Sequence, residues 1–170
     1  MSLRRISLRD FVIVSELDLE LAAGFTVLTG ETGAGKSIII GALNLVLGER
    51  ADRTLIRSGA EACAVEAVFD VAKLGAPLAV LLDENGLEPC EDNQLVLKRV
   101  FTAAGANRQF VNGSPTTLST LAAVGELLVD MHGPHDHQSL LHPAKQLAIL
   151  DAFGGLQTQL AAFAELVRHR

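Results

Sequence analysis

The stretch Gly30-Glu31-Thr32-Gly33-Ala34-Gly35-Lys36-Ser37 decides the fold. It fits the pattern G-x-x-x-x-G-K-[ST], a phosphate-binding loop that joins a strand to a helix. Residues 25–29 before it are apolar and partly β-branched, which predicts a buried strand. Residues 38–47 after it are apolar on nearly every side, which predicts a buried helix ending at Gly48. The sequence therefore predicts the strand, loop and helix that this motif requires.

The residue types of this loop suit a nucleoside triphosphate with Mg²⁺. Backbone N–H groups and the positive end of the helix attract phosphate, and Gly30, Gly33 and Gly35 permit a close approach that a Cβ would block. Lys36 can reach the β- and γ-phosphate oxygens, and the Ser37 hydroxyl can ligate Mg²⁺. We therefore expect residues 30–37 to bind ATP.

Composition predicts one globular, cytoplasmic domain. The chain has 170 residues, of which 49% are hydrophobic, and contains no apolar run long enough to span a bilayer and no secretory signal. Cys63 and Cys90 are too few for a disulfide framework and lack metal-type spacing. The net charge of −6 argues against a general nucleic-acid binder, so we expect any DNA contact to use a local basic patch.

Alternating polar and apolar residues predict several half-exposed strands. Residues 4–10 and 16–21 should form an antiparallel pair, residues 62–70 a further strand, and residues 95–101 and 107–112 a second hairpin. Together with the loop, these predict an α/β P-loop NTPase fold. Its sheet should be mixed, with antiparallel hairpins flanking the buried P-loop strand and helix.

Basic residues occur in two places. Arg50, Arg53 and Arg57 follow the predicted helix, so Arg57 or Arg50 could reach the phosphates or DNA, or all three could belong to a solvated loop. Both readings stay open. Lys98, Arg99 and Arg108 make the second hairpin locally basic, which favours a solvated face over the alternative of a DNA backbone contact.

Residues 78–84 end in Asp83-Glu84, like the acidic strand of a P-loop enzyme. Pro77 before them and Asn85-Gly86 after them favour a short helix instead.

Further along, Ser114-Pro115 predicts the start of a helix that reaches about Val124, and residues 126–131 a second buried strand. The loop that follows carries His132, His135 and His137, with His142 beyond, but its spacing completes no metal site. We expect this loop to face the γ-phosphate, with Gln138 or a histidine orienting water.

Pro143 should begin a helix that runs to Phe153. Another follows Gly154-Gly155, with apolar residues at spacings of four, three and four, which is a short coiled-coil-like seam (Leu156, Leu160, Phe163 and Val167). We therefore expect a lobe over residues 1–153 and the start of a helical arm over residues 156–170.

Several stretches together resemble the RecN family of bacterial DNA double-strand-break repair ATPases, which are related to SMC and Rad50 proteins. The most specific are Leu55-Ile56-Arg57-Ser58-Gly59 and the run from Met131-His132-Gly133 through His137-Gln138-Ser139-Leu140-Leu141. Family members often have Gln where this chain has Pro134, so Gln138 is a candidate substitute for the residue that senses Mg²⁺ and the attacking water.

The resemblance implies more than the residues do. It implies the N-terminal lobe of an ABC-type ATPase head, which binds ATP and Mg²⁺ between two heads and engages DNA. A coiled coil and a C-terminal head lobe would follow, and homodimers would form through heads and coiled coil. We therefore expect a fragment that binds nucleotide, hydrolyses little alone, and belongs to a cytoplasmic, nucleoid-associated protein.

Two alternatives remain. A self-contained P-loop kinase or NTPase would use Asp83-Glu84 and needs residues 78–83 to be a strand. A non-catalytic DNA-clamp or dimerisation module would associate through Leu160 and Phe163.

Overall fold

The computed structural model describes residues 2–31, 35–129 and 143–168. Contacts divide the chain into two compact units, Met1–Leu128 and Val129–Arg170. Each unit is described by itself below.

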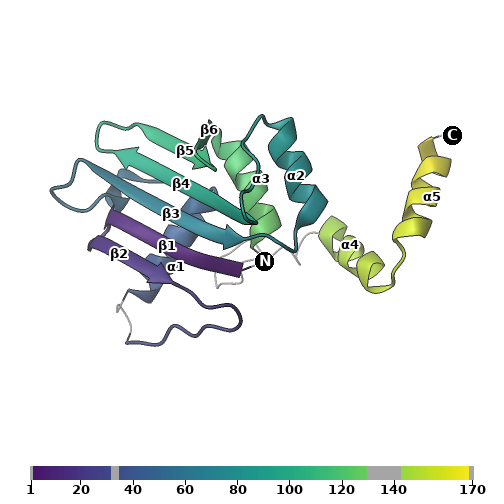
Figure 1. The fold of residues 1–170 in the computed structure, drawn as a ribbon, viewed down its shortest axis with the longest axis horizontal. Coiled ribbons are helices and arrows are strands. Elements are labelled where there is room, and N and C mark those ends of the chain that lie inside the picture. Colours follow the sequence, from purple (N-terminus) through teal and green to yellow (C-terminus); the bar gives the residue numbers. More distant parts are fainter. Residues whose placement is uncertain (1, 32–34, 130–142, 169–170) are drawn as a thin grey trace. The chain divides into compact units, whose positions relative to one another are not determined.

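The first unit is built on a six-stranded sheet of order β2-β1-β3-β4-β5-β6 (Figure 1). Every neighbouring pair is antiparallel, and the register confirms both predicted hairpins. The strands are β1 (Ser2–Phe11), β2 (Val14–Glu20), β3 (Ala62–Asp70), β4 (Gln94–Thr102), β5 (Asn107–Val111) and β6 (Ser114–Thr116).

Three α-helices complete this unit: α1 (Lys36–Val46), α2 (Gly75–Glu84) and α3 (Leu118–Leu128), with a short 3₁₀ helix η1 (Arg53–Leu55) after α1. Helix α1 packs on β1, β3 and β4, α3 packs on β5, and α2 contacts α3. The strands alternate as predicted, so one sheet face buries Ile6, Leu8, Val65, Leu95 and Leu97 beneath α1 and α3. Only one face of α1 is buried, through Ala42, Leu45 and Val46.

The opposite face of the sheet carries cross-strand ion pairs. Arg5 Nε donates to Asp18 Oδ1 at 2.6 Å, and Lys98 Nζ lies 3.0 Å from Glu66 Oε2. The hydrogen bond from Arg5 lowers the pKa of Asp18 below its ordinary value. Exposed pairs of this kind contribute little to stability, but they fix which charges this face presents.

Arg99 of β4 is not part of a solvated basic face: it is fully buried. Its guanidinium donates to Leu45 O at 2.7 Å and to Glu49 O, and reaches Asn107 Oδ1 at 3.2 Å. Burial lowers the pKa of Arg99 to about 10, so it stays cationic at neutral pH. Because Lys98 is also paired, the expected basic hairpin is reduced to the exposed Arg108.

Two glycines hold the same end of α1 against α3. A Cβ on Gly48 would lie 2.6 Å from the Ala122 Cα, and one on Gly125 would collide with the Leu47 carbonyl oxygen. Gly48 also has φ 107, which ends the helix as predicted. The C-terminal end of α1 is therefore fixed by Arg99 on one side and by backbone contact with α3 on the other.

The predicted strand at residues 25–29 is wrong. These residues have no regular secondary structure, and Phe25 is 94% and Val27 60% exposed. A strand that is apolar on both faces needs neighbouring strands, and no described strand pairs with this stretch. For the same reason the described sheet is antiparallel rather than mixed.

The helix predicted around residues 78–84 is confirmed as α2, with Asn85 as its C-cap and Gly86 at φ 62. Asp83 and Glu84 are exposed on its last turn. They do not end a strand beside the phosphate loop, which removes the basis of the kinase alternative.

The chain after β5 differs from the prediction. Ser114 and Pro115 belong to β6, and the Thr117 hydroxyl caps α3 by accepting from Thr120 N at 3.1 Å. Helix α3 then continues to Leu128, so residues 126–128 are helical and not strand. The hydrophobic run of 126–131 reads equally well as a buried helix end, which is why it misled the prediction.

The second unit contains α4 (Pro143–Phe153), as predicted, and α5 (Gln157–Arg168). Leu160 and Phe163 of α5 are exposed in the structure, and their role in association stays a prediction. No helix within the described ranges is long and apolar enough to cross a bilayer.

We predict that Arg99→Ala lowers the free energy of unfolding by about 3 kcal/mol, because it removes the hydrogen bonds to the Leu45 and Glu49 carbonyls and opens a cavity. Arg99→Met should lower the free energy of unfolding by less, since methionine keeps most of the packed volume. Urea unfolding followed by circular dichroism measures both.

The matched control is Arg108→Ala on the next strand, which is exposed and should change stability by less than about 0.5 kcal/mol. Equal midpoints for Arg99→Ala and Arg108→Ala would show that Arg99 does not anchor α1.

Candidate functional site: the N-terminus of α1

The candidate site lies where the glycine-rich loop enters α1. Gly35 precedes the helix with φ 92, a left-handed conformation that favours glycine. Its carbonyl accepts from Ile38 N at 3.1 Å and Ile39 N at 3.2 Å, which closes the first turn. Gly30, at the other end of the loop, has φ 156. Residues 32–34, including Gly33, lie outside the described residues.

Lys36 is the first residue of α1 and its side chain turns back toward the loop. Its ammonium donates to the carbonyl oxygens of Gly30 and Glu31, the latter at 2.8 Å. The positive charge is therefore held at the start of the loop. Phosphate oxygens are stronger acceptors than these carbonyls, so the same ammonium suits a phosphate placed there.

The helix N-terminus fits an anionic ligand. No side chain caps α1, and its first turn contains no acidic residue. The positive end of the helix dipole and the Lys36 ammonium thus act in the same place, without a competing carboxylate on the first turn. Ser37 follows Lys36 in that turn, and the role of its hydroxyl as a Mg²⁺ ligand stays a prediction.

The structure places Arg57 at the end of β1. Arg57 N donates to Asp10 O at 2.9 Å, and its guanidinium lies 3.7 Å from Asp10 Oδ1. Among described residues no hydrogen bond or ion pair joins Arg57 to residues 30–37, and Arg50 is exposed in the segment after α1. A role for Arg57 in nucleotide binding stays a prediction.

The other predicted site residues cannot be placed. Gln138, Pro134 and the histidines of the loop after α3 all lie outside the described residues. Within the ranges that the structure describes, no group of His, Cys, Asp and Glu could hold a metal ion.

Sequence reasoning missed Arg99, the residue that fixes the rear of the site's helix. The signal was present: in β4, Leu95, Leu97, Arg99 and Phe101 alternate with Val96, Lys98 and Val100. Period two therefore puts Arg99 on the apolar face, where an arginine must find partners. The guanidinium also lies 4.7 Å from the centre of the Phe101 ring.

Curated relatives match most of the chain. A Vibrio cholerae "DNA repair protein RecN" is 42% identical over 153 residues, covering 90% of this chain and 27% of that protein. The RecN of Xylella fastidiosa strain 9a5c is 39% identical over 167 residues, covering 98% of this chain and 29% of that protein. The RecN of Bacillus subtilis strain 168 is 37% identical over 159 residues, covering 94% of this chain and 27% of that protein.

The chain is homologous to the RecN proteins. It spans less than a third of the length of these curated relatives. A family profile described as "AAA domain" also matches residues 5–76, which contain the phosphate loop and α1.

Solved structures show the same fold. An SMC head domain from Thermotoga maritima is 26% identical with a TM-score of 0.54, covering 72% of this chain and 41% of that chain. The recombination mediator RecF bound to ATP is 18% identical with a TM-score of 0.56, and the match covers 89% of this chain and 38% of that chain. The chain thus shares the α/β fold of the parts of these SMC and RecF structures that it matches.

Replacing either of two glycines in this helix region by alanine should change the stability of the chain, in opposite directions. Gly41→Ala should stabilise the chain by about 0.5–1 kcal/mol, because Gly41 lies inside α1 and its added Cβ meets nothing within 4 Å. Gly35→Ala should destabilise it by about 1 kcal/mol, because Gly35 has positive φ although its surroundings are equally open.

Thermal unfolding of the two variants against the parent chain measures the difference. The geometry of the loop entry would be contradicted if both substitutions shifted the melting temperature in the same direction.

Proposed function

We propose that this chain is the ATP-binding lobe of a RecN-type DNA-repair ATPase. The observation that carries the proposal is the homology to RecN over about nine-tenths of the chain, combined with Lys36 at an uncapped helix N-terminus. In this proposal residues 30–37 bind the triphosphate of ATP, and Ser37 binds Mg²⁺.

The chain's own residues divide the work of binding. The backbone N–H groups at the start of α1 orient the phosphates, and Lys36 neutralises their charge. Bound Mg²⁺ would supply charge neutralisation for phosphoryl transfer. In the proposal Arg57 also contacts the phosphates, and Gln138 orients the attacking water.

The remaining functions are proposed for the whole protein. ATP would bring two heads together, as in the ATP-driven dimerization of SMC ATPases. The first 153 residues would form a lobe that joins a C-terminal head lobe, and residues 156–170 would begin a coiled-coil arm. Homodimers would engage DNA in the cytoplasm, associated with the nucleoid.

The dimerisation-module alternative has no observation in its favour beyond the exposed apolar residues of α5, which the coiled-coil arm explains equally well.

Removing the Lys36 ammonium should weaken nucleotide binding. We expect Lys36→Ala to raise the Kd for ATP–Mg²⁺ by about 10- to 100-fold, the loss of one charge-assisted hydrogen bond. Isothermal titration calorimetry measures this, with Lys73→Ala as control, since Lys73 is an exposed lysine next to α2. Equal affinities for the two variants, or no ATP binding by the parent chain, would refute the nucleotide site.

Hydrolysis by the 170-residue chain should be below about 1% of the turnover of a full-length RecN measured side by side, because in the proposal a complete ATPase head also needs the C-terminal lobe. Turnover at the full-length rate that disappears in Lys36→Ala would instead establish a self-sufficient enzyme.

A further inference from the structure

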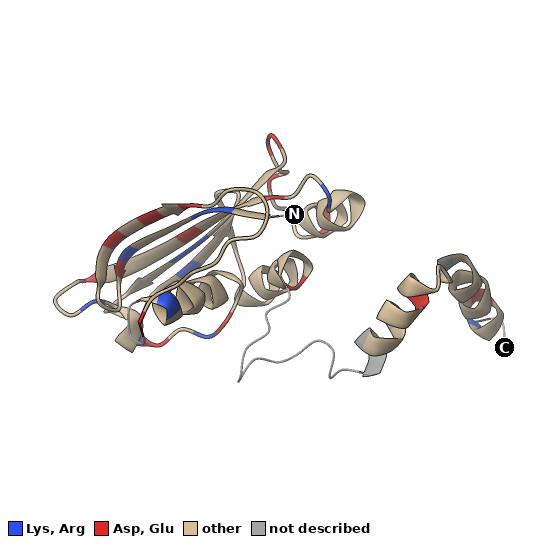
Figure 2. Cartoon of the chain, turned by 90° about the horizontal axis from the view of Figure 1, so that it is seen from below, with Lys and Arg blue, Asp and Glu red and all other residues tan. Residues whose placement is uncertain are grey.

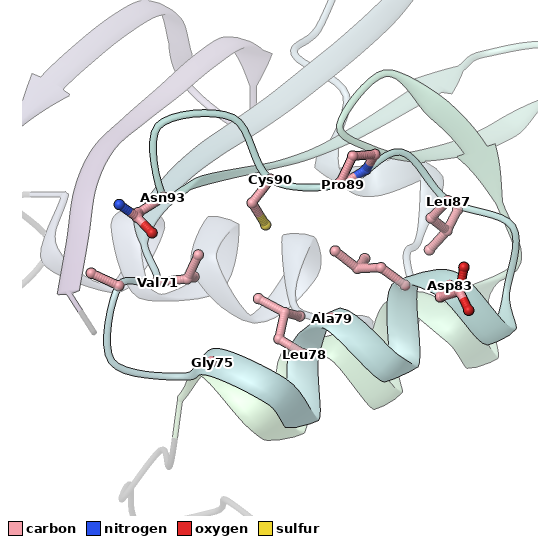
Figure 3. Close-up of a pocket in the computed structure, with 11 residues that line it drawn as sticks. Val71, Gly75, Leu78, Ala79, Asp83, Leu87, Pro89, Cys90 and Asn93 are labelled. Atoms are coloured by element: carbon pink, nitrogen blue, oxygen red, sulfur yellow. The ribbon is translucent and has the colours of Figure 1, made fainter.

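A cavity lies in the first unit between α2 and the loop of residues 87–93 that leads into β4 (Figure 3). Its volume is about 370 Å³, near the lower end of the range of small-ligand sites. Buried side chains of Val71, Leu78, Leu82 and Leu87 form its interior. Figure 3 shows the Cys90 sulfur directed into this space and Asp83 at one end of it.

The walls of the cavity are held in place by hydrogen bonds. The Asn112 side chain donates to Glu88 O at 2.9 Å and to Pro89 O at 3.0 Å, and its Oδ1 accepts from Val96 N. On the other side, Val71 N donates to Asn93 O at 2.8 Å. The loop is thereby tied to β4 through Asn112 and to the residue after β3 through Val71, so the cavity exists without a ligand having to order it.

The rim of the cavity is acidic. Residues 75–93 contain five acidic residues and no Lys, Arg or His. Four of them, here called the acidic rim, are exposed and either line the cavity or adjoin a lining residue: Asp83, Glu84, Glu88 and Glu91. Asp92, the fifth, lines a separate hollow with Arg4 and Arg5. Figure 2 shows acidic residues on the loop that projects beside α2.

None of the acidic rim forms an ion pair with any residue in the part of the chain that the structure describes. The basic residues that flank the acidic rim in sequence are Lys73, ten residues before Asp83, and Lys98, which pairs with Glu66. Such a rim repels nucleic acid and other anions, whereas a cation placed beside it gains from several carboxylates at once.

We propose that this cavity is a docking site for a basic peptide segment that inserts an apolar side chain between α2 and residues 87–93. The cavity takes the apolar anchor, and the acidic rim pairs with lysine or arginine residues beside it. The pairing of one buried anchor with a charged rim is the usual division of labour in a peptide site. The inference is independent of ATP binding, because the cavity shares no residue with residues 30–37.

The probe is a fluorescein-labelled peptide of about twelve residues, built only of lysine and leucine, with leucines three and four apart. It is titrated into the 170-residue chain by fluorescence anisotropy. Because the whole chain is acidic, binding of the probe alone is not diagnostic, and the test lies in matched variants.

Ala79 lines the cavity and is exposed on α2, so Ala79→Trp should fill the cavity and weaken binding about 10-fold. Ala76→Trp makes the same change on the same helix outside the cavity and should have no effect. Glu88→Lys should weaken binding by a similar factor, whereas Glu61→Lys, at the other end of β3, should not.

Alkylation of Cys90 gives a second readout. Iodoacetamide should modify Cys90 more slowly when the peptide is bound, while Cys63, fully buried in the core, stays unreactive in both samples. A peptide with alanine replacing leucine should not protect Cys90.

The proposal is overturned if Ala79→Trp and Ala76→Trp bind the probe equally. Equal binding of a peptide in which glutamate replaces lysine, or preferential binding of a DNA duplex that Ala79→Trp abolishes, would overturn it as well.

Discussion

The buried guanidinium of Arg99 is the interaction on which the position of α1 depends. It comes from the centre of the sheet and takes the carbonyl oxygens of Leu45 and Glu49, at the negative end of the helix. A cation there is favoured by the helix dipole, and the carbonyls at a helix end have no partner within the helix. One residue therefore joins the strand core to the helix that carries the phosphate loop.

The two ends of α1 are treated in opposite ways. The rear is locked by Arg99 and by the close approach of Gly48 and Gly125 to α3. The front has no side-chain cap and no acidic residue in its first turn, and its lysine is held at the loop by two carbonyl oxygens. A rigid anchor at one end and a lysine beside an uncapped helix N-terminus at the other are features of a preorganised anion site.

Much of this arrangement could be predicted from the sequence. The alternation in β1 to β5, the helix after the P-loop and the helix at 78–84 follow from local patterns, which carry their own periodicity. The strand at 25–29 could not be judged in this way, because its formation depends on neighbouring strands. The cap at Thr117 was missed because Ser114-Pro115 offers equally good chemistry three residues earlier. Arg99 was predicted to be solvated because it is charged, although the alternation of β4 places it on the apolar face of the strand.

The connection between β2 and β3 has a consequence for how the protein folds. Every other pair of consecutive strands is adjacent in the sheet, but β3 must pass β2 and pair with β1, and the intervening segment contains the P-loop and α1. Closing so long a loop costs chain entropy that local hairpins do not incur. We therefore expect the meander from β3 to β6 to form before β1 pairs with β3. Helix α1 packs on β3 and β4 and is held by Arg99 of β4, so it can dock on this meander before β1 and β2 complete the sheet.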